Sequence, residues 1–375
     1  MWIEALMLVG ALQGPQPEID RVVESAIRDG VFPGAVVIIG TSAEILYSKG
    51  YGHYTWSLDA PVPAPDSTLF DLASLTKVVA TTPAVMRLVD EGTLRLGTLV
   101  KDVLPAFEGR GKGVVTVRHL LAHTSGLRSF LPLNEMASTP QEARGIVLSE
   151  PLSWRPDSRV QYSDLNAMLL GWIVEEVSGT TLDDFVSREI YDAAGMQQTR
   201  FGVTRSVHDR VMPVGLWRGH VISGQLHDQN AVRLGGVSGH AGLYSTASDL
   251  ARYAQILLNK GTVAGGVLFS EWVIDVFTRR QRGNRSLGWE MRDTTSTDNT
   301  GSLLSPAAFG HSGFTGTSMW IDPDLDLLVV FLTNRVFAPR VSGSISRLKQ
   351  VRAAIADAAA LMLRAQSLNG RLDAR

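Results

Sequence analysis

Three short segments of the chain carry side chains that together could perform nucleophilic chemistry. The first is residues 70–77 (FDLASLTK), in which Ser74 opens a predicted helix and Lys77 follows three residues later on the same face. A serine hydroxyl is a poor nucleophile until a base removes its proton. A lysine in a partly desolvated cleft can take that proton or can stabilise a second base. The pair alone is a weak signal, because Ser346 and Lys349 repeat it in a predicted terminal helix and Ser74 could simply cap its helix.

The second segment contains Tyr162 and Asp164, just before a predicted helix that starts near Asn166. A phenol beside an ammonium group can ionise well below its usual pKa of about 10 and then act as a general base. The alternative is structural, with Asp164 capping the helix and Tyr162 packed in the core.

The third segment is residues 310–318 (GHSGFTGTS), a glycine-rich stretch that contains His311, Ser312 and Gly313 and enters a predicted strand. Small residues let a substrate backbone approach an edge strand closely. The backbone N–H that follows Gly313, which belongs to Phe314, could then point at an acyl oxygen. The alternative is an ordinary glycine-rich turn into a strand.

The three segments fall in a fixed order, with separations of 162 − 74 = 88 and 311 − 162 = 149 residues. In this order the chain resembles the class C β-lactamase branch of the penicillin-recognising serine hydrolases, which includes D-amino-acid-releasing peptidases and carboxylesterases. The signature of that branch is Ser-x-x-Lys, then Tyr-x-Asn, then Lys/His-x-Gly. The resemblance runs from about Glu18 to Asn334 and includes residues 88–99, 117–127 and 239–246.

This resemblance implies a hydrolase that cleaves an ester or amide through a covalent acyl-enzyme, without metal or cofactor. It implies Ser74 as the nucleophile and Lys77 with Tyr162 as the proton-handling pair. The oxyanion hole would be formed by the backbone N–H groups of Ser74 and Phe314. The alternative function is a catalytically silent protein that binds penicillin or peptidoglycan fragments, which intact Ser74, Lys77 and Tyr162 disfavour.

Two positions depart from the signature. Asp164 stands where asparagine is usual, so an amide donor to the substrate carbonyl is lost or is replaced by a protonated acid. His311 stands where β-lactamases usually carry lysine, and a neutral or half-charged imidazole binds a carboxylate less securely than an ammonium group. We therefore expect esterase or peptidase-like activity with weak β-lactamase activity.

Several other polar residues leave alternatives open. His240 could line the cleft or brace a glycine-rich turn. The arginine cluster could be a solvated loop or could supply a contact for a substrate carboxylate; its members are Arg279, Arg280, Arg282 and Arg285. His119 and His123 have metal-site spacing, but no glutamate follows His119 and the chain has no cysteine, so we expect no metal site.

The predicted elements place strands near both ends of the chain and helices between them. They are helices at 18–29, 75–89 (kinked at Pro83), 117–122, 141–148, 166–177, 182–193, 248–258 and 345–365, and strands at 35–39, 44–47, 286–291, 318–321 and 325–332. We therefore expect an α+β, β-lactamase/transpeptidase-like fold, in which terminal helices flank an antiparallel sheet and a cleft separates the sheet from a helical lobe.

We expect one catalytic domain over residues 17–367, with an α/β part at 17–73 and 286–367 and a mainly helical part at 74–285. Residues 1–16 would be a leader or a disordered tail, and residues 368–375 a tail. The ambiguous leader slightly favours a location outside the cytoplasm but does not determine the compartment. The sequence does not determine the oligomeric state.

The composition narrows the partners. A formal net charge of −2 over 375 residues argues against a nucleic-acid-binding protein. The longest apolar runs, such as Leu327 to Leu332, are far shorter than the roughly 20 residues of a membrane span. The expected partner is a small-molecule or peptide substrate.

Overall fold

The centre of the fold is a six-stranded antiparallel sheet with the strand order β10-β11-β12-β13-β1-β2. The computed structural model describes residues 15–373. Strands from the two ends of the chain build the sheet: β1 (Gly34–Gly40), β2 (Ile45–Gly52), β10 (Glu290–Met291), β11 (Phe309–Ser312), β12 (Ser318–Asp322) and β13 (Leu327–Thr333). Because β1 pairs with β13, the N-terminal and C-terminal segments form a single sheet.

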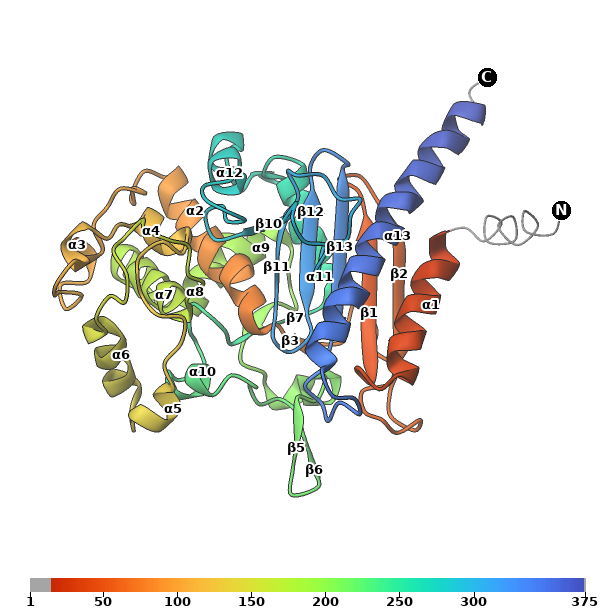
Figure 1. The fold of residues 1–375 in the computed structure, drawn as a ribbon, viewed down its shortest axis with the longest axis horizontal. Helices are drawn as coiled ribbons and strands as arrows, with labels where there is room; N and C mark the ends of the chain where they lie inside the picture. The colour runs from red at the N-terminus through yellow and green to blue at the C-terminus, as the bar shows by residue number, and fades with distance from the viewer. Residues whose placement is uncertain (1–14, 374–375) are drawn as a thin grey trace.

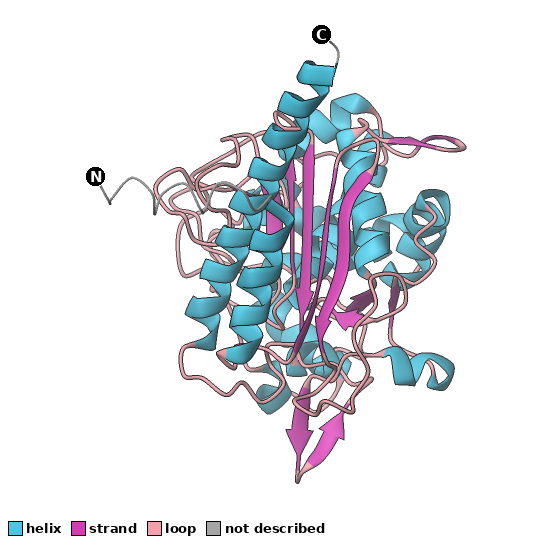
Figure 2. Cartoon of the chain, turned by 90° about the vertical axis from the view of Figure 1, so that its right-hand side faces the viewer, coloured by secondary structure: helices cyan, strands magenta, loops and turns pink. Residues whose placement is uncertain are grey.

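Strands β1 and β13 are buried on both faces. Along β1, Val36 and Ile38 contribute to the core shared with the helical lobe, whereas Val37 and Ile39 contribute to a second core. This alternation follows from the two-residue period of a strand. Two helices, α1 (Pro15–Arg28) and α13 (Ser344–Asp373), lie side by side over the second core, as Figures 1 and 2 show.

A helical lobe covers the other side of the molecule (Figure 1). Its α-helices are α2 (Thr82–Asp90), α3 (Val100–Val103), α4 (Val117–Leu121), α5 (Leu133–Met136), α6 (Pro140–Ser149), α7 (Asp164–Ser178), α8 (Leu182–Val186), α9 (Asp192–Ala194) and α10 (Gln229–Arg233). Helix α11 (Ala247–Leu258) packs on β1 and β13, and α12 (Glu271–Thr278) packs on α2.

Three smaller sheets complete the described structure. Strand β7 (Leu243–Ser245) lies between β3 (Phe70–Asp71) and β4 (Arg200–Phe201), which fixes the segment just before Ser74. The hairpin of β5 (Gly215–Trp217) and β6 (His220–Ile222) projects from the body of the molecule in Figure 1. The other hairpin pairs β8 (Thr262–Val263) with β9 (Gly266–Val267).

The predicted fold class is confirmed, and most of the long helices and strands were predicted near their observed bounds. Helix α1 begins three residues earlier than predicted and includes Pro15 and Pro17 in its first turn. Proline is tolerated there because the N–H groups of the first turn make no hydrogen bond within the helix. Helix α13 continues to Asp373 through most of the predicted tail. The predicted strand at 286–291 shrinks to the two residues of β10.

Some expectations concern the ends of the chain or the membrane. The predicted leader or tail at residues 1–16 lies mostly outside the described residues. Among residues 15–373, no helix combines the length and the hydropathy that a membrane crossing requires.

Candidate active site

Ser74 lies in a short 3-10 turn, η1 (Ala73–Leu75), which leads into a π-helical segment, η2 (Lys77–Thr81), and then into α2. Pro83 lies in the first turn of α2 and cannot donate a backbone hydrogen bond. The hydroxyl of Tyr191 donates instead to the carbonyl of Val79, four residues before the proline, at 3.1 Å. The predicted single kinked helix is therefore three helical types in succession, because the proline interrupts the α-helical hydrogen-bond ladder.

A strained residue precedes Ser74. Ala73 has a φ of 47°, a left-handed conformation that is uncommon outside glycine. The side chain of Asp71 supports this turn by accepting the Ala73 N–H at 2.9 Å and the His227 N–H at 2.8 Å. Burial raises the pKa of Asp71 to about 6, against the lowering effect of these two hydrogen bonds. The turn that presents Ser74 is therefore fixed by a buried carboxyl group three residues earlier.

Lys77 is buried, with 3% of its surface exposed, and its ammonium group faces three oxygen atoms. Nζ lies 3.1 Å from Ser74 Oγ, 3.0 Å from the carbonyl of His240 and 2.8 Å from Oδ1 of Asp164. Burial alone would lower the pKa of Lys77, but the neighbouring Asp164 and Tyr162 outweigh burial and raise it above 10.5. Lys77 is therefore a cation in the resting site and not a free base.

Tyr162 contacts Ser74 directly. Its hydroxyl donates to Ser74 Oγ at 2.9 Å, and Lys77 Nζ lies 5.0 Å from the centre of its ring. Burial raises the pKa of Tyr162 above 10.0, and the lowering effect of the Lys77 charge does not overcome it, partly because Asp164 is also close. This direction makes the resting Tyr162 a neutral phenol and gives no support to a phenolate in the resting site.

Asp164 is the first residue of α7 and pairs with Lys77. The carboxylate that stands in place of the usual asparagine is therefore engaged by Lys77 and lies beside the candidate proton-handling groups. The sequence had suggested a direct role for Asp164 in substrate binding, and the structure brings its carboxylate to Lys77 instead.

The loop between β11 and β12 brings Gly313 and Phe314 next to the Ser74 turn. The Thr317 hydroxyl donates to the carbonyl of Leu72 at 3.0 Å, which ties the loop to that turn. A Cβ atom on Gly313 would lie 2.3 Å from the same carbonyl oxygen, so only glycine permits this approach. Within the described residues the backbone N–H groups of Ser74 and Phe314 have no acceptor, which leaves both free for an oxyanion.

A cavity of about 260 Å³ opens beside Ser74. Its lining includes Ser74, Tyr162, Arg285, Glu290, Asn299, His311, Ser312, Gly313, Phe314, Lys349 and Arg352. Each of the three segments therefore contributes at least one residue to this cavity, whereas Lys77 and Asp164 are absent from its lining.

His311 is neutral at this cavity. Burial, followed by the positive charges of Arg285 and Lys77, lowers the pKa of His311 well below 6.5. Its Nδ1 donates to the carbonyl of Ser312 at 2.9 Å, which leaves Nε2 as a buried acceptor without a partner in the described structure. His311 therefore offers no positive charge to a substrate.

Arg285 is the member of the arginine cluster that reaches the cavity. It is 9% exposed, its guanidinium carbon lies 5.2 Å from the centre of the Tyr162 ring, and its Nη1 has no partner among the described residues. Arg280 and Arg282 instead donate to backbone carbonyls of surrounding loops. The sequence could not tell which arginine points inward, because all four lie in one irregular stretch.

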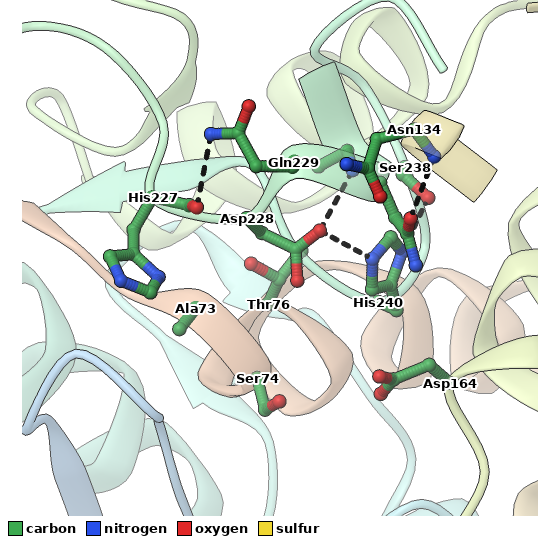
Figure 3. A network of polar contacts seen from close by, with 12 residues as sticks. Ala73, Ser74, Thr76, Asn134, Asp164, His227, Asp228, Gln229, Ser238 and His240 are labelled. Atoms are coloured by element: carbon green, nitrogen blue, oxygen red, sulfur yellow. Dashed lines mark hydrogen bonds and ion pairs between the residues drawn. The ribbon is translucent and has the colours of Figure 1, made fainter. Parts of the chain in front are cut away.

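His240 braces a glycine-rich turn, which was one of its two predicted roles. Its ring lies 2.7 Å from the Ser238 hydroxyl and 3.1 Å from Asp228, in the network that Figure 3 shows beside Ser74. Its side chain is absent from the cavity lining, whereas its backbone carbonyl accepts from Lys77. Asp228, which the sequence analysis did not single out, thus supports the turn that holds the Lys77 ammonium group.

His119 and His123 serve local structure. His119 closes a capping box with Thr116 and also contacts Asp157, whereas His123 contacts the Ser163 N–H and Asn166. Among residues 15–373, no group of three or more possible metal-binding side chains comes together.

The chain is similar to known proteins over most of its length. A family model described as "Beta-lactamase" matches residues 19–352. The chain is 32% identical over 359 residues to an Escherichia coli (strain K12) protein named "Putative D-alanyl-D-alanine carboxypeptidase", covering 86% of this chain and 82% of that protein. It is 33% identical over 363 residues to the N-acetylmuramyl-L-alanine amidase of Bacillus subtilis (strain 168), covering 86% and 81%.

Solved structures share the fold. EstCE1, described as a hydrolase with promiscuous acyltransferase activity, matches with a TM-score of 0.74 and 20% identity, over 90% of this chain and 98% of that chain. A penicillin-binding protein homologue from Caulobacter crescentus matches with a TM-score of 0.73 and 23% identity, over 92% and 98%. The family match over most of the sequence, with the two relatives above 30% identity, shows that the chain belongs to the beta-lactamase family.

Proposed function

We propose that this beta-lactamase-family serine hydrolase cleaves an ester or amide through a covalent acyl-enzyme on Ser74. The observation that carries the proposal is the position of Ser74 Oγ, which contacts both Lys77 Nζ and the Tyr162 hydroxyl at the wall of a cavity. A nucleophile in contact with two proton-exchanging groups meets the geometric requirement for activation.

Because Lys77 is charged and Tyr162 is neutral at rest, neither can take the Ser74 proton until Lys77 has lost one, and Asp164 is the carboxylate that contacts Lys77. Lys77 gives a proton to Asp164 across their 2.8 Å contact and becomes a neutral amine. That amine takes the Ser74 proton as Oγ attacks the substrate carbonyl. Tyr162 gives its proton to the leaving group and regains one from Lys77, after which Asp164 returns its proton to Lys77. Lys77, Tyr162 and Asp164 thus end in their starting protonation states, and Ser74 is acylated. A water molecule then attacks the acyl carbonyl, its proton passes through the same groups to Ser74 Oγ, and the acyl group leaves as an acid.

The oxyanion formed by this attack would lie between two backbone donors. The free N–H groups of Ser74 and Phe314 belong to two neighbouring segments. The hydroxyls of Thr315 and Thr317 hold these segments together by donating to the carbonyls of Asp71 and Leu72. Preorganised donors of this kind stabilise the charge that develops on the carbonyl oxygen.

The substrate class follows from the charges at the cavity. Neutral His311 cannot supply the fixed cation of the β-lactamase pattern, so uncharged esters should react better than β-lactams. Arg285 lines this cavity, its Nη1 has no partner among the described residues, and it would meet a substrate carboxylate. The names of the two bacterial relatives, a carboxypeptidase and an amidase, support an amide or peptide as the natural substrate.

The test is a parallel assay of p-nitrophenyl esters, N-acyl-D-Ala-D-Ala peptides and nitrocefin. The wild-type chain should release a burst of one equivalent and then turn over, fastest with an ester. Ser74→Ala should lose this activity, and Ser346→Ala, which changes the other Ser-x-x-Lys serine, should retain it. A burst without turnover would favour the silent binding protein, and neither burst nor turnover would refute the proposal.

A further inference from the structure

Two arginines are buried behind the loop of residues 313–317 without a carboxylate partner in the described structure. Arg335 follows β13 and donates to the carbonyl of Phe314 at 2.5 Å. Arg352 lies on α13 and is 6% exposed. Its Nη2 donates to two carbonyls of the loop, at 3.1 Å to Gly313 and 2.8 Å to Thr317. Both cations are therefore bonded to the backbone of the loop that supplies the Phe314 N–H.

The contact between Arg352 and Gly313 bears directly on that N–H. The Gly313 carbonyl and the Phe314 N–H belong to one planar peptide unit and point in opposite directions. A cation that bonds the carbonyl end fixes the orientation of the unit. It also polarises the unit, because linked hydrogen bonds strengthen one another, and the N–H becomes a better donor.

We propose that Arg352 is a positioning residue, which orients and polarises the Gly313–Phe314 peptide so that its N–H stabilises the oxyanion. This inference rests on the proposed function, because it assigns a task in the hydrolysis of an acyl group at Ser74. It extends the oxyanion hole to a side chain on the last helix, 38 residues after Phe314 (352 − 314 = 38).

The burial of this charge supports a functional role. A buried cation bonded only to neutral oxygens costs stability, because carbonyls replace water but do not neutralise the charge. Burial, together with the neighbouring Arg335, lowers the pKa of Arg352 to about 9, while Glu290 opposes the shift. Arg352 also interrupts the apolar face of α13 that includes Leu348 and Ile355. The hydrogen bonds that Arg352 makes to the carbonyls of Gly313 and Thr317 explain why a charge is kept at this destabilising position.

A direct substrate contact is the main rival role, because Arg352 also lines the cavity. The geometry favours positioning. Both hydrogens of Nη2 are already used by Gly313 and Thr317, and Nη1 donates to Asn299 at 3.1 Å, so both terminal nitrogens are engaged and only Nε has no partner among the described residues. In Arg285 it is the terminal Nη1 that has no partner.

The test compares an uncharged p-nitrophenyl ester with its thionoester, in which sulfur replaces the carbonyl oxygen. Sulfur is a weak acceptor, so the thionoester gains little from a polarised N–H. The variants are Arg352→Met and, should that variant fail to fold, Arg352→Lys, whose shorter side chain cannot span both carbonyls. Arg347→Met changes an exposed arginine on the same helix and is the matched control. Thermal unfolding and labelling of Ser74 verify the folded, active fraction.

In Arg352→Met we expect kcat/KM for the ester to fall roughly ten- to a hundred-fold, less than the 10²- to 10³-fold loss of a whole oxyanion donor. The thionoester rate should change less than threefold, and Arg347→Met should match the wild type. Equal losses for both substrates would make Arg352 merely structural and overturn the proposal. So would an unchanged ester rate, or a loss confined to substrates that bear a carboxylate. A wild-type chain with no Ser74-dependent ester hydrolysis would instead refute the proposed function, and the inference with it.

Discussion

The ammonium group of Lys77 lies 2.8 Å from Oδ1 of Asp164, so an ion pair with a buried cation adjoins Ser74 at the point where an asparagine was expected from the family signature. Removing one partner of such a pair leaves an uncompensated buried charge. The pair keeps Lys77 charged in the resting site, as its raised pKa shows. It also gives Lys77 a neighbour that can accept its proton.

Replacing Asp164 with asparagine removes that acceptor and restores the family pattern. We expect Asp164→Asn to lower kcat/KM for p-nitrophenyl esters by about 10²- to 10⁴-fold, the usual range for a lost acid–base group. Asp184→Asn, an exposed change, should leave the rate unaltered. Wild-type activity in Asp164→Asn, measured by steady-state kinetics on folded protein, would show that Lys77 needs no carboxylate.

Tyr162→Phe removes the phenol but retains the ring between Lys77 and Arg285. The leaving group then lacks its proton donor, so kcat should fall by about 10²- to 10⁴-fold for amides. Esters with a p-nitrophenolate leaving group should lose less, because that group departs without a proton. A pair of steady-state assays on an amide and an ester measures the contrast, and equal losses would contradict the assigned step.

The rate should be insensitive to pH across a wide neutral range. His311 and His123 have pKa values well below 6.5, so they are already deprotonated and neutral there, while Lys77 and Tyr162 have raised pKa values and remain protonated. We expect kcat/KM for an uncharged ester to be flat from about pH 7 to 9.5. An inflection near pH 6.5 that His311→Gln abolishes would show that His311 titrates normally.

Arg285 should determine how well substrates with a carboxylate are accepted. Its charge-assisted hydrogen bond to a carboxylate is worth about 1.5 to 3 kcal/mol, or roughly ten- to a hundred-fold in kcat/KM. Arg285→Gln should therefore impair N-acyl-D-Ala-D-Ala peptides and nitrocefin by that factor and leave an uncharged ester within threefold. Arg279→Gln, from the same cluster, is the control. An equal loss of kcat/KM on all substrates would contradict this role and would indicate that Arg285 acts by positioning the Tyr162 ring, over which it lies.

The sequence predicted those parts of the site that lie in short contiguous motifs. Each of the three motifs combines a reactive side chain or a glycine with a local turn signal, so the helix, strand or loop that carries it could be inferred. The motifs are Ser74 with Lys77, Tyr162, and the loop at Gly313. Arg285 and Arg352 could not be assigned in this way, because only tertiary packing decides which arginine faces the cavity. One signal was present for Arg352, a charged residue on the apolar face of the last helix. The protonation of Tyr162 could not be read from the sequence either, because it depends on whether burial outweighs the nearby Lys77 charge.

The extent of the fold shows the same division. Apolar runs or helical spacing in the sequence predict the long strand β13 and the helices α7 and α11. No such pattern predicts the two-residue strands β3, β4 and β10, because each forms by pairing with a strand from another part of the chain. The π-helical segment after Ser74 likewise depends on Tyr191, which lies 112 residues from the carbonyl that it satisfies.

The central claim is that Ser74 becomes acylated. Intact-mass analysis and peptide mapping after reaction with a fluorophosphonate test it most directly, with Ser74→Ala and Ser346→Ala treated in parallel. The account predicts one adduct per chain, located on Ser74, retained in Ser346→Ala and lost in Ser74→Ala together with ester hydrolysis. An adduct on Ser346, or hydrolysis that continues in Ser74→Ala at the wild-type rate, would contradict it.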